Sequence, residues 1–364
     1  MKVLFLPVNI ASFPFLTTQA LNQLDGVEAM CITNHLSVLN TVGRNTLFIP
    51  KKIPRKKPIH WLYHKLTYRQ KILKWIRWAD VLHYTWSPAF DDGADLQVAK
   101  QLNKPVFIEW VGSDIRDHVY LSSINPYYAH AFDNGYEYHE LESSNHRMRV
   151  LQQFSSVGAQ PLVNPEMSLY VDREFFPGGV HRLMPRINVM DLAPSYPEVS
   201  TKRPLVIHSP SARVCKGTQY VLEAVDALHK EYDFDFRLIE NLPRSEALKL
   251  MATCDVFIDQ LILGSYGLAS IEAMSFGKPV LCYIMPQVFE AGLSKACPIV
   301  NANPDTLKSQ LARLLADGSL RSELGRKGRA FAEQQHDAKV IGKQLVTLYK
   351  AAFKNTRKPE GESS

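Results

Sequence analysis

The chain has 364 residues, more than one ordinary domain holds and comfortable for two. Apolar residues make up 46% and charged residues 21%, as in a globular protein with a sizeable core, and the formal net charge is +6. The five scattered cysteines include no C-x-x-C pair, which argues against a disulfide framework and a structural zinc site. No run approaches the roughly 20 apolar residues that span a bilayer, and the first seven residues lack the long apolar core of a secretory signal. We therefore expect a cytoplasmic protein.

Short apolar runs alternate with amphipathic segments in the first half of the chain. The runs predict strands at residues 2–7, 29–32, 81–84, 106–110, 155–157 and 180–185, and Leu162 is a further strand candidate. The intervening segments predict helices at residues 17–24, 94–102 and 136–154. This alternation is typical of parallel strands joined by crossover helices, so it predicts a doubly wound α/β domain.

A proline-rich, polar stretch from Asp191 to Pro204 interrupts the pattern and predicts an interdomain linker. The pattern then restarts, with strands expected at residues 205–209, 236–239, 256–259, 280–284 and 298–300. Helices are expected at residues 218–230, 245–252, 306–316 and 320–353. We therefore predict an N-terminal domain at 1–195, a C-terminal domain at 200–335, a helix at 336–353 that returns to the first domain, and a disordered tail at 354–364. Two such sheets facing each other form a cleft lined by the carboxyl ends of their strands.

The segment Leu205–Val225 combines a buried strand, a short basic loop and the start of a helix. Arg213 and Lys216 lie in the loop, and Gly217 opens the helix. The amides and dipole of a helix start, together with two cations, favour a bound diphosphate. The alternative is a solvated loop with incidental basic residues, and the G-x-x-x-x-G-K-[ST] spacing of a Walker A loop is absent.

The segment Asp255–Tyr283 has a strand ending at Asp259, a glycine-bearing loop with Gly267, and a short helix that carries Glu272. A carboxylate one turn inside such a helix can accept hydrogen bonds from both ribose hydroxyls, and glycines let backbone amides approach phosphate oxygens closely. The alternative makes Glu272 a surface residue and the glycines turn formers.

The two segments together resemble the donor-binding domain of family 4 glycosyltransferases. Its pattern of an Arg/Lys-Gly loop followed by G-x-G-x(4)-E-A-M-x-x-G-K-P-V matches Arg213, Lys216-Gly217-Thr218 and the run from Tyr266-Gly267 to Val280. The resemblance covers most of residues 200–350 and implies a GT-B fold, with two Rossmann-like domains facing across a cleft. It implies that Arg213 and Lys216 bind the donor diphosphate and act in catalysis. It further implies that Glu272 binds the ribose and that Gly267 and Leu268 offer amides to the phosphates.

The chain departs from the family pattern at the sugar-binding position. The family's E-x(7)-E pair places a first glutamate eight residues before the second, where this chain has Gly264. That carboxylate ordinarily contacts the sugar. Asp259, at the preceding strand end, is a candidate substitute, although a strand-end aspartate is commonly a turn former.

The N-terminal half offers polar groups at two predicted strand ends. Gly112, Ser113 and Asp114 follow the strand at 106–110, and similar G-S-D-I-R loops occur in the acceptor domain of these transferases, where histidine usually replaces Val111. We predict Asp114 as a catalytic residue and Gly112 and Ser113 as acceptor-side residues, the alternative being a loop-stabilising pair between Asp114 and Arg116. A further acceptor-side candidate, His83, ends the strand at 81–84, and a buried structural histidine is the alternative there.

The loop Asn9–Phe15 follows the first predicted strand and is also expected at the cleft. By contrast, Asp233-Phe234-Asp235 resembles a D-x-D metal site, but it begins a strand and is interpreted as structural. We expect no metal.

The stretch Lys51–Arg77 holds ten Lys or Arg residues, no acidic residue and four Trp or Tyr residues. Such a composition suits an anionic membrane surface, where each cation contributes about 1 kcal/mol. Nucleic acid is attracted by the same field, but no recognisable nucleic-acid module accompanies it. The alternative is a solvated basic helix. We therefore expect peripheral association with the inner face of the membrane, and no nucleic-acid partner.

These features predict transfer of a sugar from a nucleotide-diphosphate sugar to a hydroxyl of a glycan or lipid-linked glycan, and the resemblance to family 4 glycosyltransferases implies retention of configuration. The expected role is in polysaccharide or lipopolysaccharide biosynthesis, with no cofactor besides the donor substrate. A nucleotide-sugar epimerase of the same fold and a non-catalytic nucleotide-sugar-binding scaffold remain as alternatives.

Overall fold

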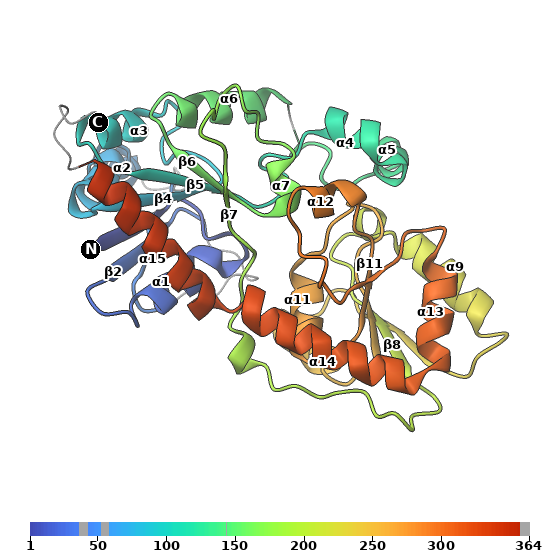
Figure 1. Ribbon diagram of the computed structural model, residues 1–364. Coiled ribbons are helices and arrows are strands. Elements are labelled where there is room, and N and C mark those ends of the chain that lie inside the picture. The colour runs from blue at the N-terminus through green and yellow to red at the C-terminus, as the bar shows by residue number, and fades with distance from the viewer. Residues whose placement is uncertain (36–42, 52–57, 143, 357–364) are drawn as a thin grey trace, which may run out of the picture.

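The computed structural model describes residues 1–35, 43–51, 58–142 and 144–356, and it contains two parallel sheets (Figure 1). The first sheet has the order β3-β2-β1-β4-β5-β6-β7. Its strands are β1 (Lys2–Leu6), β2 (Glu28–Thr33), β3 (Thr46–Phe48), β4 (Val81–Thr85), β5 (Val106–Trp110), β6 (Gln160–Val163) and β7 (His181–Arg182). The central strands β1, β4 and β5 are apolar runs covered on both faces, as in parallel sheets generally.

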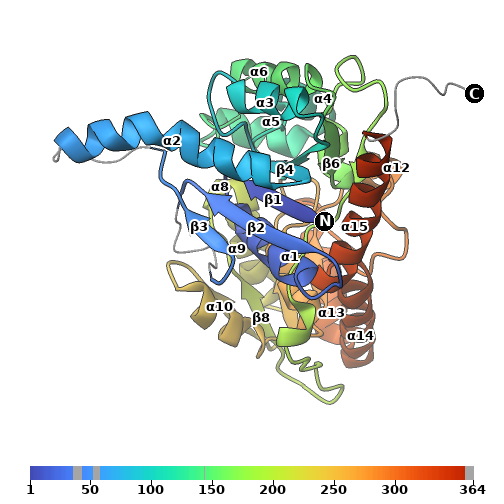
Figure 2. The same ribbon diagram turned by 90° about the vertical axis from the view of Figure 1, so that its left-hand side faces the viewer.

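Helices cover both faces of this sheet (Figures 1 and 2). One face is covered by α1 (Phe13–Leu21) and by the C-terminal helix α15 (Ala338–Asn355). The other elements of the N-terminal domain are η1 (Ile10–Ser12), α2 (Pro58–Trp78), α3 (Ala94–Gln101), α4 (His118–Ile124), α5 (Pro126–Asp133), α6 (Ser144–Ser155) and α7 (Pro165–Ser168). Of these, α2, α3 and α6 lie on the opposite face from α15.

The second sheet has the order β12-β11-β10-β8-β9. Its strands are β8 (Leu205–His208), β9 (Asp235–Leu238), β10 (Val256–Ile258), β11 (Val280–Cys282) and β12 (Val300–Asn301). The helices of this domain are α8 (Arg213–Lys216), α9 (Thr218–Leu228), α10 (Arg244–Met251), α11 (Leu268–Ser275), α12 (Pro286–Glu290), α13 (Leu307–Ala316) and α14 (Gly318–Gln335). The two doubly wound domains expected from the alternating pattern are therefore present.

The chain passes between the domains at two adjacent places. The first passage lies just before η2 (Val189–Asp191), which already contacts α14, and the second separates α14 from α15. Ile187 and Asp337 form a β-bridge that joins the two passages side by side. At the second passage α15 leaves the C-terminal domain and packs on α1 of the N-terminal domain.

His336 fixes the backbone at this crossing. Its Nδ1 lies 2.7 Å from the Pro185 carbonyl, which can only accept, so Nδ1 carries the proton. Its Nε2 then accepts from the Tyr266 hydroxyl at 3.0 Å. Tyr266 belongs to the loop before α11, so the crossing is tied to that loop by one neutral imidazole.

Several sequence-based boundaries differ from the structure. Residues 155–157 form no strand, because α6 continues to Ser155 and a segment as short as Ser-Ser-Val cannot be told from a helix end by its periodicity. The helix expected at 136–154 starts only at Ser144, and the helix expected at 320–353 is divided at His336. The tail expected from residue 354 lies outside the described residues from 357 onwards, whereas α15 extends to Asn355.

The basic stretch forms most of α2, although residues 52–57 of it lie outside the described residues. Ile72 and Ile76 are buried in the core, which holds the C-terminal part of the helix. The N-terminal part extends outward from the body of the domain (Figure 2).

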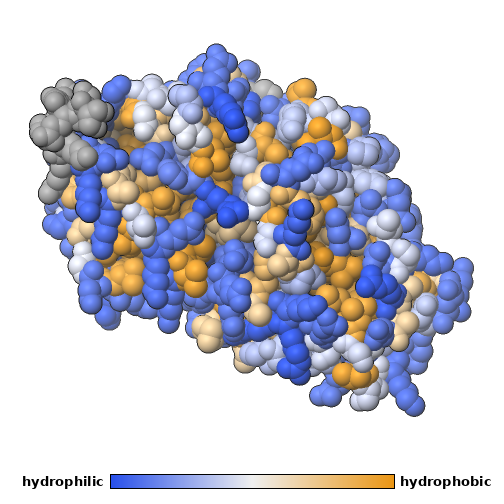
Figure 3. All heavy atoms as spheres, in the orientation of Figure 1, coloured by the Kyte–Doolittle hydropathy of each residue, from blue (hydrophilic) through white to orange (hydrophobic). Residues whose placement is uncertain are grey.

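Among the described residues, no helix has the length and apolar character needed to cross a bilayer. On the face shown in Figure 3, hydrophilic side chains predominate and hydrophobic groups form separate patches.

We predict that His336 makes the stability of the fold depend on pH. Burial lowers the pKa of His336 to about 4, whereas an unfolded histidine titrates near about 6.5. Below about pH 6.5 the unfolded chain binds a proton at His336 that the native state does not bind. The free energy of unfolding is therefore retained above about pH 6.5 and falls as the pH decreases towards 4. Since one pKa unit corresponds to about 1.4 kcal/mol, the loss from this residue is about 3 kcal/mol.

Urea unfolding of wild type and His336→Gln between pH 7.5 and pH 4 measures this loss. The wild type should lose about 3 kcal/mol more than the variant over this range. The control His130→Gln, at an exposed histidine, should follow the wild type. Equal losses in wild type and His336→Gln would show that His336 becomes charged in the native state.

Candidate active site

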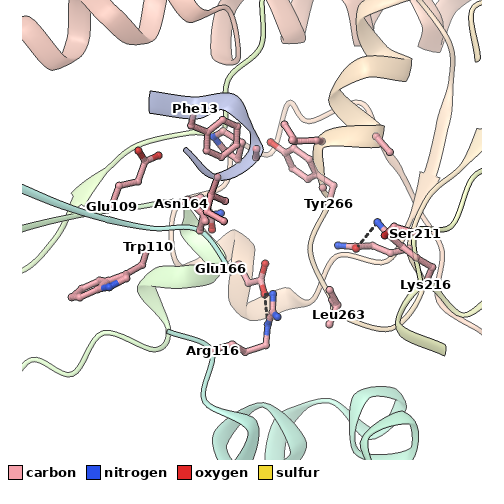
Figure 4. A pocket seen from close by; sticks show the side chains of 18 of the residues that line it. Phe13, Glu109, Trp110, Arg116, Asn164, Glu166, Ser211, Lys216, Leu263 and Tyr266 are labelled. Carbon is pink, nitrogen blue, oxygen red and sulfur yellow. Dashed lines mark hydrogen bonds and ion pairs between the residues drawn. The ribbon is translucent and has the colours of Figure 1, made fainter. Parts of the chain in front are cut away.

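A cavity of about 370 Å³ lies between the domains, at the carboxyl ends of strands from both sheets (Figure 4). The N-terminal domain contributes Ile10, Ala11, Phe13, Glu109, Trp110, Val111, Arg116, Asn164, Glu166, Leu183 and Pro185. The C-terminal domain contributes Ser209, Ser211, Lys216, Gln260, Leu263, Tyr266, Gly267, Leu268 and Ala269. The loop Asn9–Phe15 thus lies at the cleft, as expected for a loop that follows the first strand.

Lys216 places a cation on the C-terminal side of the cavity. Its Nζ lies 2.8 Å from Asp259 Oδ1 and 2.9 Å from Gln260 Oε1. Burial opposes both charges, but the mutual attraction outweighs it: the pKa of Lys216 is raised and that of Asp259 is lowered. The pair therefore stays ionised, and Lys216 is fixed at the end of α8.

Asp259 also organises the start of α11. Its Oδ2 accepts from the Ser270 hydroxyl at 2.6 Å and from the Gly267 amide at 3.3 Å. Gly267, at the N-cap, offers no side chain to the first turn, and Gly267, Leu268 and Ala269 all line the cavity. The positive end of this helix therefore faces the space beside Lys216. Asp259 positions these groups, and its carboxylate is not among the groups that line the cavity.

Arg213, expected beside the diphosphate, points elsewhere. Its guanidinium pairs with Glu240, with Nε 2.7 Å from Oε1, and the Arg213 side chain is 58% exposed. Neither Arg213 nor Gly217 lines the cavity. The first amides of α8 are also occupied, because Glu137 of the N-terminal domain accepts from Val214 N at 2.8 Å and from Cys215 N at 2.9 Å. Of the two predicted cations, the structure brings only Lys216 to the cavity.

Glu272 lies one turn inside α11, where the sequence places it, but it does not line the cavity. Its Oε1 accepts from Arg244 Nε at 3.0 Å. Burial raises the pKa of Glu272, and the Arg244 charge offsets part of that rise. Its predicted contact with ribose stays a prediction.

On the N-terminal side, Asp114 stabilises its own loop. Its carboxylate accepts from the Gly112 amide at 2.7 Å and from the Val111 amide at 3.1 Å. Burial raises the pKa of Asp114 to about 7, although these amide bonds act in the opposite direction. Asp114, Gly112 and Ser113 do not line the cavity, whereas Val111 does. The geometry thus matches the loop-stabilising role weighed for Asp114, but its partners are amides and not Arg116.

His83 lies beneath the cavity in a fully buried network. Its Nδ1 lies 2.5 Å from the Tyr349 hydroxyl of α15, and its Nε2 lies 3.2 Å from Glu109 Oε2. Glu109 in turn accepts two bonds from Arg186, at 2.5 and 2.8 Å. Burial lowers the pKa of His83, so this histidine is neutral and structural in its contacts. Only Glu109 of this network lines the cavity.

Sequence reasoning missed two carboxylates of the cavity, Glu109 and Glu166. Glu109 could have been found, because a single charged residue in the apolar strand 106–110 requires a buried partner. Glu166 carries no such signal: it lies in a short helix capped by Asn164, and its partner Arg116 is 50 residues away. The D-x-D pair is structural in its contacts, since Asp233 and Asp235 pair with Arg203 at 3.4 and 2.8 Å.

Comparisons with known proteins agree with this architecture. Residues 234–331, which lie in the C-terminal domain, match the family described as glycosyl transferases group 1. No curated protein sequence matched.

Solved structures resemble nearly the whole chain. Sucrose-phosphate synthase from Thermosynechococcus elongatus has 15% identity and a TM-score of 0.61, with 98% of this chain and 100% of that chain covered. HepE from Anabaena, in complex with UDP and glucose, has 14% identity and a TM-score of 0.58, with 96% and 100% covered. A putative UDP-N-acetylglucosamine 2-epimerase from Listeria monocytogenes has 13% identity and a TM-score of 0.55, with 100% and 99% covered. At these identities the likeness shows the fold alone; the predicted GT-B fold and the resemblance to group 1 glycosyltransferases are confirmed.

Gly264 stands where the family pattern has its first glutamate, and its surroundings exclude a side chain. Its φ is +78°, and a Cβ there would lie 2.3 Å from Cγ of the fully buried Met285. We predict that Gly264→Ala costs about 3 kcal/mol, from left-handed strain and the displaced methionine together. In Gly158→Ala, where φ is +68° and no atom lies within 4 Å, only the strain of about 1 kcal/mol applies.

Urea unfolding of both variants separates the two contributions. If Gly264→Ala and Gly158→Ala lose the same free energy of unfolding, the Met285 side chain moves aside without an energetic penalty.

Proposed function

We propose that the protein transfers a sugar from a nucleotide-diphosphate sugar to the hydroxyl of a glycan or lipid-linked glycan, with retention of configuration. The observation that carries the proposal is the meeting of Lys216 and the open N-terminus of α11 at one interdomain cavity. The family match of residues 234–331 supports a glycosyl transfer.

The donor diphosphate fits the C-terminal side of the cavity. Lys216 offers a point charge, and the Leu268 amide offers a hydrogen bond along the dipole of α11. The predicted donation from the Gly267 amide would require it to leave Asp259, to which it donates at 3.3 Å. Negative charge develops on the diphosphate as the glycosidic bond breaks, so these groups stabilise the departing group most strongly in the transition state. The Asp259 pair keeps the ammonium in place before the substrate binds, which removes the cost of ordering it during the reaction.

The sugar and the acceptor then lie towards the N-terminal side. Glu109, Arg116 and Glu166 form the polar part of this wall, and Phe13 and Trp110 form an apolar part. We propose a retaining transfer in which no side chain of the protein acts as a nucleophile. The proposed reaction also uses no cofactor or metal ion.

We predict that one nucleoside diphosphate stabilises the protein selectively. The measurement is a thermal-shift series with UDP, GDP, ADP and the common sugar nucleotides of each. A ligand at 100 times its Kd adds about 2.7 kcal/mol to the free energy of unfolding and so raises Tm. Lys216→Ala should abolish the shift, and Glu272→Ala should weaken it through the ribose. The control Lys230→Ala changes an exposed lysine outside the cavity and should leave the shift intact.

The same nucleotide identifies the donors to use in product assays. Turnover that requires an added glycan acceptor supports transfer, whereas conversion of the donor without any acceptor identifies an epimerase. Binding with neither reaction identifies a nucleotide-sugar-binding scaffold, and no Tm shift at millimolar nucleotide contradicts the donor site.

Association with an anionic membrane surface is the second part of the proposal, and the described part of α2 supports it. Lys71, Lys74 and Arg77 are exposed, and within the described part of the chain no carboxylate lies within 4 Å of them. Lys71 lies over the ring of Tyr63, which is 59% exposed. By contrast, Lys51 and Arg69 are paired with Asp91 and Asp92. A membrane contact here would bring a lipid-linked acceptor towards the N-terminal domain.

We predict that the protein floats with liposomes containing phosphatidylserine at low salt and not with neutral liposomes. Each exposed cation near the surface contributes about 1 kcal/mol, so Lys71→Glu/Lys74→Glu should lower the partition coefficient by at least tenfold. The control Lys230→Glu/Lys308→Glu changes two lysines of the C-terminal domain by the same charge and should float normally. Absence of wild-type flotation at low salt would contradict the membrane proposal.

A further inference from the structure

The cavity contains carboxylates from one domain only. Position 264 of the C-terminal domain cannot hold an acid, because Met285 fills the space that its side chain would need. Among the described residues, the acids that line the cavity are Glu109 and Glu166, both from the N-terminal domain. A sugar bound in this cavity can therefore meet a carboxylate only on the side opposite Lys216 (Figure 4).

Glu109 is already fully engaged. Each of its two oxygens accepts a bond from Arg186, and His83 lies 3.2 Å from Oε2. Burial opposes its ionisation, but Arg186 outweighs burial and lowers the pKa of Glu109 to about 2. A sugar hydroxyl would have to compete with a buried, bidentate ion pair for this carboxylate.

Glu166 keeps more accepting capacity. Arg116 Nε and Nη2 lie 3.2 and 3.1 Å away, and both reach the same oxygen, Oε1. This arrangement leaves Oε2 outside the guanidinium contact. Burial raises the pKa of Glu166, and hydrogen bonds from Arg116 and Ser265 lower it only in part. Ser265 is the neighbour of Gly264, so the Glu166 carboxylate reaches from α7 to the loop that lacks its own acid.

Arg116 is anchored from behind, and that anchor holds Glu166 in place. Glu142 accepts from Arg116 Nη1 at 2.7 Å, from the Tyr136 hydroxyl at 2.8 Å and also from the Tyr128 hydroxyl. Glu142 itself does not line the cavity. The Arg116 guanidinium thus binds both Glu142, which lies behind the cavity, and Glu166, which lines it. Its positive charge offsets the free-energy cost of burying the two carboxylates.

We propose that Glu166 binds hydroxyl groups of the donor sugar from across the cleft, and so replaces the carboxylate that position 264 cannot carry. The inference rests on the proposed function, because it requires the diphosphate at Lys216 and the sugar beyond it. Glu166 is then a specificity-determining residue for the sugar and has no contact with the nucleotide.

The test compares affinities for a nucleoside diphosphate and for the corresponding sugar nucleotide. Isothermal titration with the pairs UDP and UDP-glucose, GDP and GDP-mannose, and ADP and ADP-glucose first finds the pair that wild type binds. For that pair, Glu166→Gln should leave the Kd of the bare diphosphate within twofold. Its Kd for the sugar nucleotide should rise at least tenfold, the loss expected for a charge-assisted hydrogen bond.

Glu142→Gln is the matched control, since it weakens the same Arg116 anchor without changing the wall of the cavity. It should leave the ratio of the two Kd values as in wild type. Glu166→Asp retains the charge but shortens the side chain by one methylene, so it should also weaken the sugar nucleotide selectively. Glu166→Asp therefore replaces Glu166→Gln in the test if Glu166→Gln does not fold.

The outcomes distinguish a failure of the Glu166–sugar contact from a failure of the proposed function. Nucleotide binding with the same sugar discrimination in wild type and in the Glu166 variants overturns this inference and leaves the proposed function standing. A change of the ratio in Glu142→Gln as large as that in Glu166→Gln also overturns it, because the effect then runs through Arg116. Failure of wild type to bind any of the six ligands overturns the proposed function and this inference together.

Discussion

A lysine ammonium and an aspartate carboxylate, 2.8 Å apart and nearly closed off from water, hold together the segments that form one side of the cavity. The Lys216 side chain is 13% exposed and that of Asp259 is 1% exposed. Removing either partner would leave the other as an uncompensated buried charge, which typically costs 3–5 kcal/mol. Because Asp259 also binds the Gly267 amide and the Ser270 hydroxyl, the same pair sets where α11 begins. The position of the cation and the direction of the helix dipole are therefore fixed by one carboxylate.

The N-terminal side follows the same principle with arginine as the cation. Arg186 and Arg116 each form ion pairs with carboxylates from distant parts of the chain, and both guanidinium groups are buried. Planar, always-charged guanidinium groups suit this task, because several donors are held in one rigid plane. The polar wall of the cavity is consequently stiff before any ligand arrives, and its carboxylates remain ionisable only because their partners are buried with them.

The fold could be predicted from the sequence because each of its signals is local. Apolar runs such as Val81–Tyr84, separated by amphipathic segments, are enough to indicate parallel strands and crossover helices. Lys216 and Gly267 could be placed near a ligand for a similar reason, since each lies in the segment that follows the carboxyl end of a strand. The direction of Arg213 could not, because its partner Glu240 lies on another loop, 27 residues away.

The site on the opposite domain was less accessible to such reasoning. Asp114 has the residue type and position of a catalytic acid, yet its orientation depends on the amides of Val111 and Gly112, and no sequence pattern reports which way it turns. Glu166 was missed because its place at the cavity is fixed by tertiary contacts with Arg116. A strand-end rule finds the neighbourhood of a site, whereas long-range ion pairs decide which of its residues face the ligand.

The side-by-side crossings at Ile187 and Asp337 have a mechanical consequence. Both covalent connections between the domains lie along one line, so that line is a natural hinge. Other contacts between the domains include polar and aromatic ones: Asn125 donates to the Ile262 carbonyl at 2.7 Å, Glu137 accepts from two amides of α8, and the rings of Tyr127 and Tyr283 lie 5.5 Å apart. Each such bond contributes only about 1 kcal/mol net. A rotation about the hinge has to break these contacts but leaves the strand pairing within each sheet intact, which gives a bulky substrate a way into the space between the domains.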